Sequence, residues 1–466
     1  MWWLFLTLLT AWNVGATIRM GRRFALGSTI LLSFLVPCWM QLSVAGLPID
    51  LRVAGASVAL ITYCLHPRTQ WLGPIVFADL AMLSLMTVHV VSDSERDGFH
   101  WLILLRAYGE WGLLYVAGRF AIQHTSDLRR LLPVACLVAL LLAAWSITEP
   151  AAHCNPADYL VGHRPTDTAA STASRAGLKR AEGPLQHPIY FGLLQILFFP
   201  WTLEAARSWR NRGGPRWPLA APWLSAGGIL ATLSRGPALA LVAMLYFVGL
   251  LMLPGWRKGL LALGVCALLL ASVRYDTVLN GLNFWSGDTS LKHRPKILVD
   301  GRMVEYNGTL HRLLIWQVYL RVMGRAGLLG FGTECTTGFP VRVPFGPEDK
   351  QTLEMLRYVD NEYILLDLRF GILGVAGLLA LLLSAATNFL RLSLATANDC
   401  RLLCAGMTSA ICAVTLALLT VWLPHDFGAL LLWTAGVGSG LRAAPVEKIR
   451  PRASGRSDQR VAGNGR

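Results

Sequence analysis

Long apolar segments, separated by short polar connections, occupy most of this chain of 466 residues. About thirteen of them approach the roughly 20 residues that an α-helix needs to cross a bilayer. They lie near residues 2–18, 24–46, 53–66, 72–91, 101–121, 131–148, 187–206, 217–234, 236–253, 259–273, 362–388, 402–423 and 427–442. A backbone inside a bilayer must satisfy its own hydrogen bonds, which favours helices. The sequence therefore predicts an all-α integral membrane protein, a polytopic bundle of about 12–13 transmembrane helices with a large external loop that contains short helices.

The charged residues are few, and the basic ones are unevenly distributed. Hydrophobic residues make up 54% of the chain and charged residues 15%, with a formal net charge of +15. Arginine and lysine gather in alternate connections, at residues 22–23, 68, 129–130, 207–216 and 257–258, and in the tail after Arg442. This positive-inside pattern places these connections in the cytoplasm and the N-terminus outside. The positive charge thus indicates membrane topology and no nucleic-acid partner.

The same topology divides the chain into transmembrane and external parts. N-terminal transmembrane helices occupy residues 1–148, central ones 187–273 and C-terminal ones 361–442. A first external loop covers 149–186, a large external loop covers 274–360, and a basic cytoplasmic tail covers 443–466. Within the large loop, His311–Leu328 has the pattern of an amphipathic helix that ends at Gly327, Gly330 and Gly332. Its expected apolar side consists of Leu313, Leu314, Trp316, Val318, Leu320 and Val322.

Three arginines near the expected external surface are candidates for binding an anionic, lipid-held substrate. Arg235 follows Ser234 at the junction of two apolar segments, Arg312 lies in the large loop, and Arg180 lies in the first loop. Guanidinium groups bind phosphate oxygens in forked pairs, so several of them suit a lipid diphosphate. The alternatives are a snorkelling side chain for Arg235 and ordinary solvated loop residues for Arg312 and Arg180.

Asp360 precedes the apolar segment that begins near residue 362 and is a candidate general base. It could accept the proton of an acceptor hydroxyl as a diphosphate leaves. The alternative is a helix cap, because Asp-Asn-Glu before an apolar run is a good capping sequence. His187 could donate to phosphate or simply lie at the interface. Trp316 could stack on a sugar ring or belong to the core.

Nothing in the sequence indicates a metal or a nucleotide cofactor. The nine cysteines form no CxxC pair and no zinc spacing, and no glycine-rich nucleotide-binding loop is present. Cys154 and Cys335 both fall in the expected external loops and could pair there, although sequence separation does not determine geometry. We therefore expect neither a metal site nor a cofactor.

At these residues the chain resembles the O-antigen ligase and O-antigen polymerase superfamily of bacterial envelopes. The resemblance covers roughly residues 175–374 and the many-span layout. The first motif is an arginine, a glycine and a proline before a span (Arg180, Gly183, Pro188), and the second is a Ser-Arg-Gly at a later span (Ser234, Arg235, Gly236). The third is an arginine before a tryptophan and a Gly-x-Gly (Arg312, Trp316, Gly330, Gly332). The fourth is a His-Asn pair before Gly-x-x-Gly, of which Asn361, Gly371 and Gly374 are present. The family histidine is replaced by Asp360.

The resemblance implies a membrane glycosyltransferase in the bacterial inner membrane with its active site facing the periplasm. The donor would be a glycan on undecaprenyl diphosphate, and the acceptor another lipid-linked repeat unit or a lipid A core. Arg235, Arg312 and Asp360 would be catalytic, and Arg180, His187, Ser234, Trp316 and Asn361 would bind substrate. No metal or nucleotide would be needed, and a chain-length regulator protein would be a further partner.

The replacement of the family histidine by Asp360 favours repeat-unit polymerisation over ligation to lipid A core or to protein. His425-Asp426 could supply the missing imidazole. A hypothesis of another class is a transporter or flippase of an anionic lipid-linked substrate, which explains many spans and arginines equally well. It leaves the long external loop and the lack of recognisable inverted halves unexplained.

Overall fold

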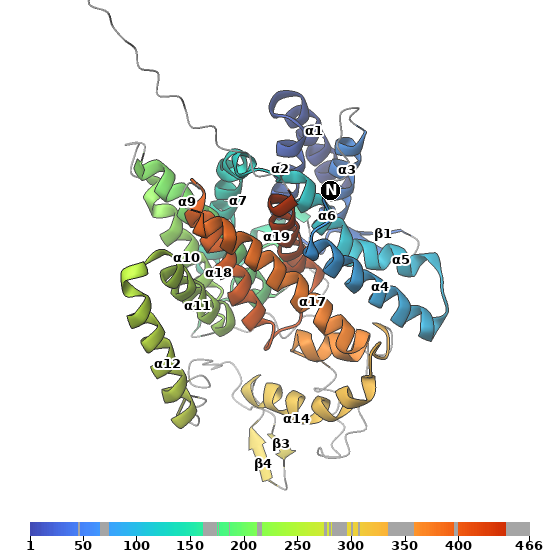
Figure 1. Ribbon diagram of the computed structural model, residues 1–466, viewed down its shortest axis with the longest axis vertical. Helices are drawn as coiled ribbons and strands as arrows, with labels where there is room; N and C mark the ends of the chain where they lie inside the picture. Colours follow the sequence, from blue (N-terminus) through green and yellow to red (C-terminus); the bar gives the residue numbers. More distant parts are fainter. Residues whose placement is uncertain are drawn as a thin grey trace, which may run out of the picture.

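The structure is a computed structural model, and it describes residues 1–44, 47–65, 74–161, 175, 177–185, 187–211, 217–274, 277–278, 281, 296–299, 302–305, 308–333, 358–395 and 399–443. These residues form an almost entirely helical molecule, which confirms the predicted all-α class (Figure 1). The N-terminal helices are α1 (Trp2–Met20), α2 (Arg22–Ser33), α3 (Leu51–Cys64), α4 (Phe77–Asp97), α5 (Trp101–Ala107), α6 (Leu113–Ala121), α7 (Thr125–Ala152) and α8 (Pro156–Val161). A π-helical turn, η1 (Tyr108–Gly112), joins α5 to α6.

The second half of the chain contains α9 (Pro188–Asn211), α10 (Ala221–Ala231), α11 (Arg235–Met252), α12 (Arg257–Val273), α14 (Gly308–Ala326), α17 (Glu362–Leu394), α18 (Arg401–Ala417) and α19 (His425–Ala443). Short 3₁₀ turns, η3 (Trp217–Ala220) and η4 (Pro254–Trp256), precede α10 and α12. In the large loop, β3 (Lys296–Val299) and β4 (Arg302–Glu305) form an antiparallel hairpin that the sequence did not predict. Figure 1 shows this hairpin and α14 together at one end of the helix bundle.

Five of the described helices are long and apolar enough to cross a membrane, namely Thr125–Ala152, Pro188–Arg210, Arg235–Met252, Pro254–Val273 and Glu362–Leu394. Several further apolar helices are shorter. The protein is thus a multi-pass membrane protein by the length and composition of its helices. The total of 12–13 spans, the domain boundaries and the side of the membrane that each loop occupies stay predictions.

One predicted span is wrong in its second half. The segment at residues 24–46 was expected to be a single helix, but α2 ends at Ser33. Pro37 lies just beyond that end, and proline interrupts helices because it lacks an N–H. The chain then forms the antiparallel pair β1 (Gln41–Val44) and β2 (Leu47–Asp50), which leads directly into α3.

The core of the bundle surrounds α9. The most apolar stretch of α9 is 83% buried, whereas that of α12 is not buried at all. Figure 1 shows α12 at the side of the bundle, where its apolar surface is available to lipid. Helices α6 and α19 pack backbone against backbone at two glycines, Gly118 and Gly436. A Cβ at Gly118 would collide with the Trp433 carbonyl, and one at Gly436 with the Tyr115 carbonyl. Close approach through small residues is a common way for membrane helices to associate.

A largely buried ion pair connects α4, α6 and α19. Both carboxylate oxygens of Asp79 accept from the guanidinium of Arg119, at 2.7 and 2.8 Å. Tyr115 and Ser439 donate to the same carboxylate at 2.6 and 2.8 Å. Charges inside a membrane domain are tolerated when they are paired in this way. This network therefore fixes the relative positions of three helices.

Candidate functional site

Arg180 and Ser234, from segments far apart in the sequence, meet in the structure. Nη2 of Arg180 donates to Oγ of Ser234 over 2.7 Å, and the Ser234 hydroxyl in turn donates to the Thr232 carbonyl over 3.1 Å. Arg180 is only 6% exposed, so it is not the solvated loop residue that was the alternative to binding. The Arg180 guanidinium is thus held in place at the start of α11, next to Arg235.

A buried carboxylate of α7 holds the segment that carries Arg180. Oε2 of Glu149 accepts the backbone N–H groups of Glu182 and Gly183, at 3.0 and 2.8 Å. Lys179 Nζ lies 3.5 Å from Oε1 of the same fully buried side chain. Gly183 has φ +56, and a Cβ there would collide with the Phe191 ring, so only glycine fits. The Arg-x-x-Gly motif therefore positions Arg180 through its backbone.

His187 lies just before α9 and accepts the Ile189 N–H at Nδ1, over 3.1 Å. Burial is the largest cause of its changed pKa, and the charges of Arg180, Arg175 and Arg312 add to it, lowering the pKa of His187 to about 3. The imidazole is therefore neutral near pH 7. Since Nδ1 accepts, the proton lies on Nε2, which is a hydrogen-bond donor rather than a further cation.

The start of α14 brings two more arginines to the same region. Nε of Arg312 donates to the Thr420 carbonyl over 3.1 Å, which fixes α14 against the segment between α18 and α19. Arg235, in the first turn of α11, extends toward the first residue of α14, because a Cβ at Gly308 would be 3.8 Å from its Nη2. Arg235 and Arg312 therefore lie at the same junction, although 77 positions separate them in the sequence.

Asp360 lies beside an imidazole that the sequence did not assign to it. Oδ2 of Asp360 is 3.7 Å from Nε2 of His311. Burial raises the pKa of Asp360, while the charges of His311 and Arg312 oppose that rise. Burial also lowers the pKa of His311, against the opposing charge of Asp360. The two side chains form a pair with a carboxylate that is more basic than usual. His425, the imidazole suggested by the sequence, instead lies 3.7 Å from Glu110.

Two of the predicted roles differ from the geometry. Asn361, not Asp360, caps α17: its Oδ1 accepts the Ile364 N–H over 3.1 Å, and its Nδ2 donates to the Leu419 carbonyl over 2.7 Å. With 1% exposure, Asn361 has a structural role that leaves no surface for substrate. The buried side of α14 is formed by Leu314, Ile315 and Tyr319, with Val318 and Val322 packed beside them, so three of the six expected residues lie on it. The expected residues Leu313, Trp316 and Leu320 are exposed.

The glycines of the resemblance join α14 to α17. Phe331 and Gly332 donate their N–H groups to the carbonyls of Leu368 and Arg369, at 2.7 and 2.9 Å. At this place α17 is interrupted by Gly371, with φ 64 and ψ −170. A Cβ at Gly330 would collide with the Arg369 backbone, and one at Gly371 with the Leu328 carbonyl. These glycines are therefore required by the close approach of two backbones.

An aromatic group borders the site on the α19 side, and no sequence motif identified it. The Tyr190 ring stacks on Phe427 at 5.6 Å and meets Trp422 edge-on at 5.8 Å. Trp422 is 36% exposed, so part of its ring remains available. Such rings commonly contact the faces of sugars and the isoprenoid chains of lipids. The isolated positions of these residues in three apolar segments concealed this group.

Five helices begin around this site: α9, α11, α14, α17 and α19. The Glu362 N–H donates to the carbonyls of Leu418 and Val421, and Arg312 donates to the Thr420 carbonyl. These bonds hold the starts of α14 and α17 against the connection between α18 and α19. A helix N-terminus carries about half a positive charge. The converging helix starts therefore add to the arginines and make the site suitable for an anion.

Comparison with known families agrees with these motifs. Residues 220–379 match the family model described as O-antigen ligase. This match confirms the resemblance to the O-antigen ligase and polymerase superfamily. The matched range runs from the end of η3 into α17 and includes Ser234, Arg235, Arg312 and Asp360, whereas Arg180 and His187 precede it. No curated protein sequence matches the chain.

Within the described parts of the chain, no group of three His, Cys, Asp or Glu side chains is arranged to hold a metal ion. Cys154 is a free thiol. Cys335, its suggested partner, lies outside the described residues.

Proposed function

We propose that the protein is a membrane glycosyltransferase that moves a glycan from undecaprenyl diphosphate to an acceptor hydroxyl. The observation that carries this proposal is the gathering of Arg180, Arg235 and Arg312 at converging helix starts beside the Asp360–His311 pair. Guanidinium groups bind a diphosphate, and a basic carboxylate accepts a proton. Glycosyl transfer from a lipid diphosphate requires both a diphosphate-binding group and a proton acceptor, and we assign both to this one site.

In the proposed reaction, the acceptor oxygen forms a bond with the anomeric carbon of the donor glycan. Its proton passes to the Asp360 carboxylate, whose raised pKa makes it a better base. The bond between the anomeric carbon and the diphosphate oxygen breaks, and the electron pair leaves with undecaprenyl diphosphate. The leaving diphosphate gains negative charge, and Arg235 and Arg312 stabilise that charge as it develops. The neutral Nε2–H of His187 donates a further hydrogen bond.

Polymerisation of lipid-linked repeat units is the reaction that we favour, with the products retained on the lipid. Ligation to a lipid A core or to protein is the second candidate, and a specific observation supports it. His311 places an imidazole 3.7 Å from Asp360, so the replacement of the family histidine does not deprive the site of one. In either reaction, the site would face the periplasm from the inner membrane, and a chain-length regulator would be a partner of the polymerase.

The experiment is complementation of a bacterial strain that lacks its own polymerase or ligase. The variants Arg235→Ala, Arg312→Ala and Asp360→Asn are expected to abolish long glycan at normal protein levels. Arg325→Ala is the matched control, because Arg325 lies on the same helix as Arg312 and is exposed. Accumulated single lipid-linked repeats indicate a polymerase, and accumulated long lipid-linked glycan indicates a ligase. Normal glycan in all three variants would contradict the proposal. Repeats trapped on the cytoplasmic face would favour the flippase alternative.

A further inference from the structure

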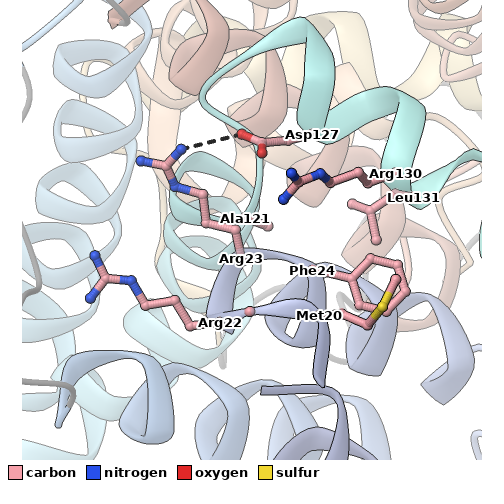
Figure 2. A pocket seen from close by; sticks show the side chains of 9 residues that line it. Met20, Arg22, Arg23, Phe24, Ala121, Asp127, Arg130 and Leu131 are labelled. Atoms are coloured by element: carbon pink, nitrogen blue, oxygen red, sulfur yellow. Dashed lines mark hydrogen bonds and ion pairs between the residues drawn. The ribbon is translucent and has the colours of Figure 1, made fainter. Parts of the chain in front are cut away.

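A pocket lined by arginines lies where α1 turns into α2 against the first turn of α7 (Figure 2). Its volume is about 250 Å³. Arg22 and Arg23 come from the first turn of α2, and Arg130 comes from α7. Met20 and Phe24 supply an apolar part of the lining. Two connections that are distant in the sequence thus contribute to one basic cavity.

Positive charge exceeds negative charge in this pocket. Asp127 is the one carboxylate among its lining residues, which also include three arginines. Nη1 of Arg23 lies 3.5 Å from Oδ2 of Asp127, the contact that Figure 2 marks. The same oxygen also accepts the backbone N–H groups of Gln123 and His124, at 3.1 and 3.0 Å, where it caps α7. The carboxylate is therefore already engaged by the fold. The lining residues carry a net charge of +2, with the Arg22 guanidinium also lying 4.8 Å from the centre of the Tyr63 ring.

The pocket lies at the opposite end of the bundle from the candidate site. Helix α7 carries Asp127 in its first turn and Glu149, which anchors the Arg180 segment, near its end. At 1.5 Å per residue, the intervening turns of α7 span about 33 Å. This length is close to the ~30 Å thickness of the hydrocarbon core of a bilayer. The pocket is thus at the opposite membrane surface, where the positive-inside pattern places both of its connections.

The edge of the pocket reaches the lipid-exposed side of α1. Met20, which lines the pocket at the end of α1, is 53% exposed. The N-cap of α2 is Gly21, which provides no side-chain capping bond, so the positive end of α2 adds to the arginines. Basic pockets between helices at the cytoplasmic surface suit lipid phosphates, because anionic lipids concentrate there.

We propose that this pocket binds the phosphate group of an anionic phospholipid, with Arg22, Arg23 and Arg130 contacting the headgroup and the apolar edge at Met20 contacting an acyl chain. The site is separate from the proposed glycan site and does not depend on it. A bound lipid would join the α1–α2 turn to α7. It would also anchor the face of the protein that the arginine connections already orient toward the cytoplasm.

Native mass spectrometry of the full-length, detergent-purified protein tests this proposal, with phosphatidylglycerol and phosphatidylcholine as probes. One phosphatidylglycerol is expected to remain bound in preference to phosphatidylcholine. The double variant Arg22→Gln/Arg130→Gln should weaken that binding about tenfold or more, because two charge-assisted contacts are lost. Arg210→Gln/Lys258→Gln is the matched control, since both side chains are exposed cations in the other basic connections. It should leave binding unchanged.

Equal retention of phosphatidylglycerol by the double variant and the control would overturn the proposal. So would protection by inorganic phosphate, in a thermal-shift assay, as strong as protection by phosphatidylglycerol, since the ligand would then be a free anion. If the double variant does not fold, Arg130→Gln alone provides the test, with an expected weakening of about threefold or more. Unchanged binding in that variant would equally contradict a lipid site here.

Discussion

The buried carboxylate of Glu149 provides a sharp test of how the Arg180 segment is positioned. It accepts two backbone N–H groups, from Glu182 and Gly183, and lies 3.5 Å from Lys179. Hydrogen bonds to a charged group contribute about 1.5–3 kcal/mol each, against about 0.5–1.5 kcal/mol for neutral ones. Glu149→Gln keeps the shape but makes both bonds neutral, so we expect a loss of about 2–3 kcal/mol. Glu149→Ala leaves both buried N–H groups without this acceptor and should cost about 2–6 kcal/mol.

This loss of free energy destabilises the ordered conformation of one short segment, residues 177–185. Because about 1.4 kcal/mol corresponds to a tenfold change in an equilibrium constant, Glu149→Gln should shift the order–disorder equilibrium of residues 177–185 toward disorder by about 30- to 140-fold. Arg175, Lys179 and Arg180 are trypsin sites in or beside this segment, so limited trypsin digestion measures the shift as faster cleavage. Transfer activity should fall in parallel, since Arg180 would no longer be held against Ser234.

Glu95→Gln is the matched control for this experiment, because Glu95 is exposed on α4 and makes the same change of charge. Its cleavage rate and activity should equal those of the unaltered protein. If Glu149→Gln behaved like Glu95→Gln in both assays, the carboxylate would not order the segment, and the positioning argument would be refuted. Faster cleavage with full activity would instead separate the fold of the segment from any role of Arg180.

Three further predictions concern the proton, the core and the backbone. Because burial raises the pKa of Asp360, kcat/KM should fall as the pH drops through that raised pKa. His311→Gln removes a charge that opposes this rise, so the fall in kcat/KM should move to higher pH. An unchanged pH profile in this variant would contradict the Asp360–His311 pair. Asp79→Ala should reduce stability by about 3–5 kcal/mol because it leaves Arg119 buried without its carboxylate, whereas Ser439→Ala should cost about 1 kcal/mol. Thermal unfolding in detergent checks both values, and similar effects of the two variants would argue against a buried ion pair. Gly371→Ala should abolish activity through the collision of its Cβ with the Leu328 carbonyl, whereas Gly259→Ala, in open space on α12, should be silent in the same transfer assay.

The helical class could be predicted because it depends on composition summed over long segments. The exact end of α2 could not, since hydropathy does not distinguish an apolar helix from an apolar hairpin such as Gln41–Asp50. The amphipathic helix in the large loop was predicted at residues 311–328 and occurs at Gly308–Ala326. Its buried side includes Leu314, Val318 and Val322 of the expected residues, whereas Leu313, Trp316 and Leu320 are exposed. The partner of α14 is α17, and a helix pattern alone does not reveal which neighbour a helix packs against.

The site shows the same division between what the sequence can and cannot reveal. Arginines at the edges of apolar segments are visible because their residue type is unusual there. The proximity of His311 to Asp360 is not visible, because 49 positions separate them and the contact depends on how α14 lies against α17. The sequence likewise does not reveal which of the adjacent residues Asp360 and Asn361 caps α17. In the structure the cap is Asn361.

Helix α14 connects the motif glycines to the proposed chemistry. Its first turns carry His311 and Arg312, and the segment after its end pairs with α17 at Gly371. Arg312 also donates to the Thr420 carbonyl, so α14 is attached at Arg312 and at its C-terminal end, about 21 Å apart at 1.5 Å per residue. A rigid helix held at two points cannot shift at one end without movement at the other. The Gly-x-Gly and the arginine that precedes it by 18 residues therefore act as one positioning device, which gives a physical reason for finding them in a single motif.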